Sequence, residues 1–233
     1  MHLFYEPEIS GETVKLSEEE SKHCTRVLRL KLNDIVWITD GKGTIYKTAI
    51  TDEHQKSCIL TIIETNKNYG QHPFKLHIAI SPPQQSNRLE WFVEKATEAG
   101  IYEITPIICE HSKRKNINQE RLQKVMISAI KQSLKASLPK LNPLIKFQDF
   151  IKKDFAGLKG IAYCTNKLKH ITDWYKNGSD CLILIGPEGD FSPVEIEMAL
   201  KHNFTGINLG NSRLRTETAV LTACFAVNLI NKT

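Results

Sequence analysis

Short apolar runs alternate with amphipathic segments from Phe74 onward, and this alternation restricts the possible folds more than any other feature of the sequence. The apolar runs predict strands at residues 74–80, 104–109, 160–165, 181–186 and 206–210. Helical spacing and capping residues predict helices over 88–100, 118–136, a segment that opens at Ser192, and 216–230. Strands that alternate with helices are typical of a parallel sheet covered on both faces. We therefore expect an α/β domain in this part of the chain.

The residues before this alternation predict a separate, β-rich unit. Four short runs at 13–16, 34–39, 44–50 and 58–64 have strand composition, and Asp40-Gly41 between two of them is a hairpin signal. Ser17 is the expected N-cap of a short helix. The segment between about 67 and 74 has no periodicity and is the expected linker. Two domains follow, one over residues 1–68 and a larger one over 74–233.

Composition excludes several classes of protein. Hydrophobic content is 41% and charged content 24%, as in ordinary globular domains. No apolar run reaches the ~18 residues of a membrane helix, and no basic, apolar leader precedes the first domain, so we expect a cytoplasmic protein. Six cysteines lack CxxC spacing and eight histidines lack ligand spacing, so no metal site is expected. A net charge of +5 permits a nucleic-acid partner without requiring one.

Two turns carry residues that suggest a binding site. In the first, Gly186-Pro187-Glu188-Gly189 follows an apolar strand and precedes a helix with a Ser192/Glu195 capping box and Pro193 at its first position. This turn matches neither a dinucleotide motif nor a P-loop. Ligands bind beyond the carboxyl ends of strands in open parallel sheets, so the turn is a candidate site. A tight turn that merely requires glycine is the alternative.

The second turn runs from Leu209-Gly210 to a helix that Thr216 can cap, with Glu217 in its first turn. Arg213 and Arg215 oppose the helix dipole at this position. They need either a bound anion or a nearby carboxylate, and Glu188 and Glu217 are the candidates for the carboxylate.

Both turns closely resemble the C-terminal motifs of the RsmE family of SPOUT-class methyltransferases, which methylate N3 of a uridine in 16S ribosomal RNA. The stretches that carry the resemblance are "LIGPEGDFSPVEI" and "LGNSRLRTETA". Upstream, "EKATEAGIYEITPI", "KQSLKASLP" and "HCTRVLRLKLNDIVWITDGKG" are similar to further family segments. The resemblance therefore extends over most of the chain.

This resemblance implies a PUA-like β-barrel at the N-terminus and an α/β domain tied in a C-terminal trefoil knot. It also implies a homodimer, with one face of the final helix in the interface, and S-adenosylmethionine bound in the knot. The implied cofactor-binding residues are Leu184, Gly186, Pro187, Glu188, Gly189, Leu209, Gly210, Leu214, Arg215 and Thr218.

For catalysis, we expect Arg215 to stabilise the anionic oxygens of uracil, with Glu217 orienting the arginine or acting as the base. The expected partner is 16S rRNA or the small ribosomal subunit. Basic side chains in two regions are the candidates for RNA contact: Lys22, Arg26 and Arg29, and Lys113, Arg114 and Lys115. Taken alone, these charges fit an ordinary solvated surface.

The chain departs from the family pattern at four places. Asp190 stands where the family usually has a third glycine, "SLKAS" replaces a segment with glycine and arginine, His2 replaces an arginine, and Asn33 replaces a glycine. Two alternatives stay open: a SPOUT ribose 2′-O-methyltransferase that acts on tRNA or rRNA, and a catalytically silent RNA-binding homologue, for which Asp190 is the best support.

Overall fold

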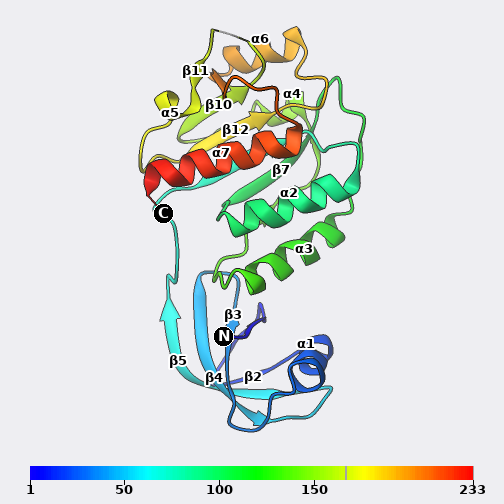
Figure 1. Ribbon diagram of the computed structural model, residues 1–233, viewed down its shortest axis with the longest axis vertical. Helices are drawn as coiled ribbons and strands as arrows, with labels where there is room; N and C mark the ends of the chain where they lie inside the picture. The colour runs from blue at the N-terminus through cyan, green and yellow to red at the C-terminus, as the bar shows by residue number, and fades with distance from the viewer. Residues whose placement is uncertain (166, 233) are drawn as a thin grey trace. The chain divides into compact units, whose positions relative to one another are not determined.

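The computed structural model describes residues 1–165 and 167–232. The chain divides into two compact units, and the division is not at a single point (Figure 1). The first unit contains Met1–Gln71 together with Ile127–Leu138, and the second contains His72–Met126 and the chain from Pro139 onward.

A five-stranded sheet forms the first unit, in the order β1-β3-β4-β5-β2. The strands pair antiparallel except for β1 and β3, which are parallel. The elements of this unit before the linker are β1 (Leu3–Tyr5), β2 (Thr13–Lys15), α1 (Glu18–Lys22), the π-helical turn η1 (His23–Val27), β3 (Ile35–Thr39), β4 (Thr44–Asp52) and β5 (Ile59–Lys67). Ser17 caps α1 as expected, accepting a hydrogen bond from Glu20 N at 3.2 Å. Closure of the sheet into a barrel stays a prediction.

The segment Ile127–Leu138 completes the first unit. Ala136 O accepts hydrogen bonds from the Thr39 hydroxyl (2.8 Å) and from Gly43 N (3.0 Å). The Ala136 side chain is buried in a small cluster with Leu3 and Ile45. Polar and apolar contacts of the β-unit therefore depend on residues far away in the sequence.

The second unit contains a sheet in which every pair of strands is parallel, in the order β11-β13-β10-β12-β6-β7-β8, with β9 paired to β7. Its strands are β6 (Leu76–Ile80), β7 (Glu103–Ile108), β8 (Lys140–Leu141), β9 (Ile145–Lys146), β10 (Leu158–Ala162), β11 (Lys169–His170), β12 (Cys181–Ile185) and β13 (Thr205–Asn208). The expected α/β domain with a parallel sheet is thus confirmed. The trefoil knot stays a prediction.

Helices pack around this sheet: α2 (Ser86–Glu98), α4 (Phe147–Phe150), α5 (Ile171–Trp174), α6 (Pro193–Lys201) and α7 (Thr216–Asn231). A further helix, α3 (Gln119–Gln132), begins in the second unit and continues into the first, which contains the chain from Ile127 to Leu138. α7 packs on β6 and β12 and is flanked by α2 and α5, while α4 packs with α6 (Figure 1). α4 and α6 contribute Phe147, Phe150 and Ala199 to a core with Ile161 and Leu184 of the strands.

The structure differs from the sequence expectations in several elements. The third helix ends at Gln132 rather than 136, because Leu134 has a left-handed backbone (φ 56°) that stops it. Thr216 does not cap α7: the N-cap is Arg215, whose side chain makes no capping bond.

The expected capping box of α6 is present, with Ser192 N donating to Glu195 Oε2 at 2.9 Å and Glu195 N donating to Ser192 Oγ at 3.3 Å.

No helix within residues 1–165 and 167–232 combines the length and the apolar character that crossing a bilayer requires.

Candidate cofactor and catalytic site

A cavity of about 680 Å³ opens in the second unit, beyond the carboxyl ends of three neighbouring strands. The segments that follow β10, β12 and β13 form its walls. Its lining residues are Ala162–Thr165, Ile185–Glu188, Asp190, Asn208–Thr216 and Ala219. The position follows the general rule for parallel sheets, and the volume falls in the range of small-molecule sites.

The turn after β12 requires its first glycine. A Cβ atom at Gly186 would lie 3.1 Å from the ring of Phe191, which packs directly against this backbone. Glu188 holds the turn to the β6–α2 loop, because its Oε1 accepts a hydrogen bond from Gln84 N at 3.0 Å. Gly186 and Pro187 thus line the cavity with a main chain held in a fixed conformation.

The segment after β13 forms the opposite wall and is joined to the first turn. The Thr216 hydroxyl donates a hydrogen bond to Gly186 O at 3.2 Å. Gly210 has φ 127°, and nothing lies within 4 Å of a Cβ placed there, so this glycine is required by its backbone conformation rather than by crowding. Arg213 and Arg215 are exposed at the rim. Among the described residues, neither guanidinium pairs with a carboxylate within 4.0 Å.

Glu217 lies behind this wall rather than in it. Its side chain is 8% exposed, and its Oε1 is 3.7 Å from Arg88 Nε of α2. The other carboxylate oxygen is buried and has no hydrogen-bond partner among the described residues. The carboxylate therefore interacts with Arg88 and not with Arg215.

Seven of the ten expected cofactor-binding residues line the cavity: Gly186, Pro187, Glu188, Leu209, Gly210, Leu214 and Arg215. The other three lie outside the lining. Leu184 is buried in the core under α4 and α6. A Cβ at Gly189 would lie 3.3 Å from His111, and Thr218 is exposed on α7.

The sequence does not predict the third wall, Ala162–Thr165, as part of the site, and it places Asp190 beside the first turn without giving it a role. It does predict the strand that ends in this wall. The missing information is the strand order, which places β10 between β12 and β13.

The lining has apolar surface and charges of both signs, which suits a partly apolar, charged ligand such as S-adenosylmethionine. Ile185, Leu209 and Leu214 provide apolar surface, Glu188 and Asp190 provide carboxylates, and Arg213 and Arg215 provide guanidinium groups. Burial raises the pKa of the Cys164 thiol, and the charge of Asp190 raises it further, against the opposing effect of Arg213.

The basic loop between β7 and α3 is anchored to the same edge of the sheet. Arg114 Nη2 donates to Gln84 O at 2.9 Å, and His111 Nδ1 is 2.9 Å from Asp190 O. That bond to the Asp190 carbonyl raises the pKa of His111. Lys113 and Lys115 are exposed, and no ion pair holds either of them within the described residues. Of the three predicted RNA contacts in this loop, Arg114 also has a structural role, because its hydrogen bond to Gln84 O anchors the loop.

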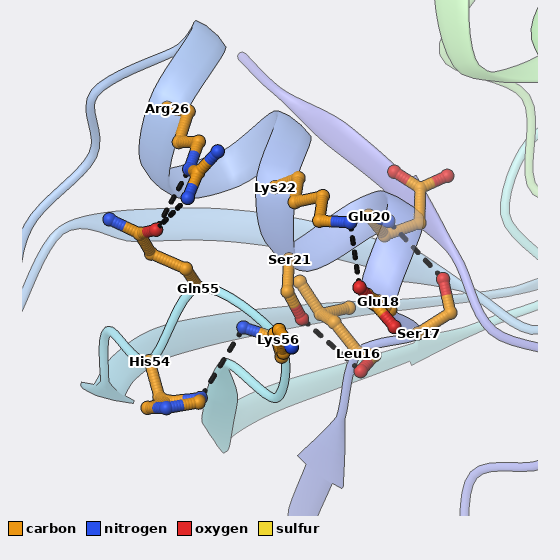
Figure 2. Close-up of polar contacts among 10 residues, drawn as sticks. All are labelled: Leu16, Ser17, Glu18, Glu20, Ser21, Lys22, Arg26, His54, Gln55 and Lys56. Atoms are coloured by element: carbon orange, nitrogen blue, oxygen red, sulfur yellow. Dashed lines mark hydrogen bonds and ion pairs between the residues drawn. The ribbon is translucent and has the colours of Figure 1, made fainter.

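The predicted RNA contacts of the first unit lie on α1, on η1 and just after it. Figure 2 shows Lys22 directed at Glu18, with Nζ 2.6 Å from Oε1. Arg26 donates from Nε (2.8 Å) and from Nη2 to Gln55 Oε1 in the β4–β5 loop. Arg29 is exposed and has a left-handed backbone, φ 56°. Sequence spacing could not reveal Gln55 as the hydrogen-bond partner of Arg26.

Among the residues that the structure describes, no group of three or more His, Cys, Asp or Glu side chains could hold a metal ion.

Two family models match the chain. A model described as an RNA methyltransferase domain matches residues 70–228, and one described as an RNA methyltransferase PUA domain matches residues 16–63. The chain is 30% identical to the ribosomal RNA small subunit methyltransferase E of Rickettsia conorii, over 93% of this chain and 90% of that protein.

Solved structures are similar over the whole length. A probable rRNA-methyltransferase from Porphyromonas gingivalis is 41% identical, with a TM-score of 0.93 and coverage of 100% of this chain and 99% of the other. The ribosomal RNA small subunit methyltransferase E from Neisseria gonorrhoeae, bound to S-adenosyl methionine, is 26% identical, with a TM-score of 0.87 and coverage of 99% and 98%.

Proposed function

The chain belongs to the RNA methyltransferase family that includes the ribosomal RNA small subunit methyltransferase E proteins, and we propose that it methylates N3 of a uridine in 16S rRNA with S-adenosylmethionine as methyl donor. The observation that carries this proposal is the cavity between the two glycine turns, with the guanidinium of Arg215 exposed at its rim and free of a carboxylate partner among the described residues.

The cofactor, when bound, supplies an activated methyl group on a positively charged sulfur. The protein has to align a uracil with it and to favour loss of the proton on N3. Holding two reactants in line can lower the barrier by roughly 7 to 11 kcal/mol. No protein nucleophile is required for this step. In this proposal the two glycine turns provide the alignment, since their main chain is fixed by the Thr216–Gly186 and Glu188–Gln84 hydrogen bonds.

Arg215 supplies the electrostatic part of the reaction. Deprotonation at N3 places negative charge on the two flanking uracil oxygens, which a guanidinium stabilises through directed hydrogen bonds. Arg215 lines the cavity, is exposed, and stands at the N-cap of α7, where the helix dipole also favours an anion. The deprotonated uracil is therefore a suitable partner for the Arg215 guanidinium, whose positive charge no protein carboxylate neutralises within the described part of the chain.

The part of Glu217 is more indirect in this proposal. Its burial and its distance of 3.7 Å from Arg88 Nε support a role in joining the first turn of α7 to α2. The two roles expected from the sequence, orienting Arg215 and acting as the base, stay predictions.

RNA binding is assigned to the basic side chains of both units: Lys22, Arg26 and Arg29, and Lys113, Arg114 and Lys115. Phosphate contacts of this kind position the RNA, and the cavity selects the base. We further propose a homodimer formed through α7 and a cytoplasmic location. Exposed apolar side chains on α7, Phe225 and Leu229, support the dimer.

The deciding experiment is nucleoside mass spectrometry of 16S rRNA from cells with and without the protein, and of small subunits treated with purified protein. N3-methyluridine that appears only with the protein is the expected result. A 2′-O-methylated nucleoside instead would identify a ribose methyltransferase, and no methylated nucleoside together with no binding of S-adenosylmethionine in calorimetry would identify a silent homologue. Either of these outcomes overturns the proposal.

A further inference from the structure

The side chain of Asp190 joins two walls of the cavity. Asp190 follows the turn after β12 and has a left-handed backbone, φ 64°. Glycine adopts this conformation without cost, and aspartate tolerates it better than most residues. Glycine would therefore fit this backbone conformation equally well. The backbone does not explain why the residue carries a carboxylate.

Both carboxylate oxygens accept main-chain hydrogen bonds. Oδ1 accepts from Phe191 N at 2.8 Å, and Oδ2 accepts from Cys164 N at 3.0 Å. The first bond is local to the turn. The second crosses the sheet from β12 to the segment after β10, which is the third wall of the cavity. Hydrogen bonds to an ionised acceptor are stronger than neutral ones.

The segment after β10 packs through Tyr163 against the core of the second unit, but it has few hydrogen bonds of its own. Apart from the hydrogen bonds between paired strands, the described part of the chain has one hydrogen bond that involves Tyr163, Cys164 or Thr165. It is the bond from Cys164 N to the Asp190 carboxylate. Loss of the carboxylate would remove the hydrogen bond that holds the main chain of this wall at Cys164, while leaving the turn after β12 in place, because Asp190 N still donates to Pro187 O at 2.9 Å.

We infer that Asp190 is a positioning residue that preorganises the cofactor cavity by holding the Ala162–Thr165 wall against the turn after β12. This inference rests on the proposed function, since it assumes that the cavity binds S-adenosylmethionine. Preorganisation raises affinity because less conformational entropy is lost when the ligand binds.

The carboxylate also acts on the one cysteine of the cavity wall. Cys164 is exposed, whereas the other five cysteines are buried. The charge of Asp190 contributes to the raised pKa of the Cys164 thiol, after the larger effect of burial. Removal of this charge should lower the thiol pKa, which gives a measurement independent of enzymatic activity.

The experiment compares Asp190→Gly and Asp190→Asn in the full chain. Glycine keeps the left-handed backbone and removes the tether, and asparagine keeps the backbone and one acceptor oxygen. We expect the dissociation constant for S-adenosylmethionine, measured by calorimetry, to rise about tenfold for Asp190→Gly and about threefold for Asp190→Asn. The KM for S-adenosylmethionine should rise in the same order, with the KM for RNA unchanged.

Asn203→Gly is the matched control, because Asn203 is exposed, also has φ 64° and lies outside the cavity lining. It should leave cofactor binding unchanged. In addition, the pH midpoint for alkylation of Cys164 should fall in Asp190→Asn and stay in place in Asn203→Gly. If Asp190→Gly binds S-adenosylmethionine as tightly as the parent, the inference is wrong. If the parent itself does not bind, the proposed function is wrong instead.

Discussion

Arg215 is the residue on which the proposed chemistry depends most. Its replacement by alanine should lower kcat roughly tenfold or more, a decrease of at least about 1.4 kcal/mol in transition-state stabilisation, because the anionic uracil then has no cationic partner. Steady-state kinetics with small-subunit RNA measures this effect. Arg215→Lys keeps the charge without the planar fork and should recover part of the rate. If Arg215→Ala keeps more than one tenth of the parent's kcat, Arg215 is not the group that stabilises the anionic uracil.

Cys164 reports on the cavity directly. Because it lines the cavity and is the exposed cysteine, S-adenosylmethionine at ten times its dissociation constant should slow alkylation by iodoacetamide about tenfold. Mass spectrometry of the digested protein measures the rate at each cysteine, and the five buried thiols serve as internal controls. Equal rates with and without the cofactor would show that it binds somewhere else.

His77 links the stability of the second unit to pH. Its ring is buried on β6, with Nε2 2.8 Å from Thr105 Oγ1, and burial lowers its pKa to about 4. The unfolded chain, with an ordinary histidine pKa near 6.5, binds a proton first as pH falls. Stability from this group is therefore complete above about pH 6.5 and is lost progressively toward pH 4.

The measurement is urea unfolding of the parent and of His77→Gln at pH 7 and pH 5. The free energy of unfolding of the parent should fall by about 2 kcal/mol more than that of the variant between these values, because the variant has no group to titrate at this position. An equal decrease in both proteins would show that the pKa of His77 is the same in the folded and unfolded chains.

Single residues also show the limits of prediction from sequence. Thr216 is a residue type that often caps helices, yet its hydroxyl donates to Gly186 O of the other turn, because the helix has its N-cap at Arg215 and Thr216 is already its first residue. The sequence identifies Arg213 and Arg215 as unexplained charges, and the structure leaves both exposed at the rim. Partners such as Gln55 and Arg88 come from distant segments, which local spacing does not encode.

At the scale of elements, the long periodic segments could be predicted, and most elements of two to four residues could not. Each predicted strand of the second unit is present, and α2, α6 and α7 lie close to their expected bounds. The elements β1, β8, β9, β11, α4 and α5 have between two and four residues each, too few to show a period. Their formation depends on neighbours in the folded sheet, such as the pairing of β8 and β9 with β7.

The face of α7 that is not packed on the sheet supports the proposed dimer. Phe225 and Leu229 are one turn apart and are 52% and 73% exposed. Charges at these positions would have to be buried at an apolar interface, so Phe225→Glu with Leu229→Glu should convert a dimer to a monomer in analytical ultracentrifugation. Val194→Glu on α6, also exposed at 61%, is the matched control and should stay dimeric. A monomeric parent protein at micromolar concentration would contradict the dimer.

At the scale of the whole molecule, RNA binding should depend on the basic loop between β7 and α3. Lys113→Ala with Lys115→Ala removes two exposed charges and spares Arg114, which also holds Gln84. The slope of log K against log salt should become shallower by about 1.4 for single-stranded RNA, roughly 0.7 for each phosphate that the variant no longer neutralises.

Binding titrations at several salt concentrations measure this slope. Lys152→Ala with Lys176→Ala is the control, because both lysines are exposed and lie in segments after α4 and α5. The same slope in the loop variant and in the parent would exclude the loop from the RNA interface.

The discontinuous first unit limits how this chain can be divided. A gene fragment that stops at residue 68 would omit Ala136, the acceptor for the Thr39 hydroxyl and for Gly43 N. It would also uncover Leu3 and Ile45. To produce the β-unit alone, an engineer would have to splice residues 127–138 onto it, and a protease that cuts between 72 and 126 would leave the β-unit tied to its missing piece only by noncovalent contacts.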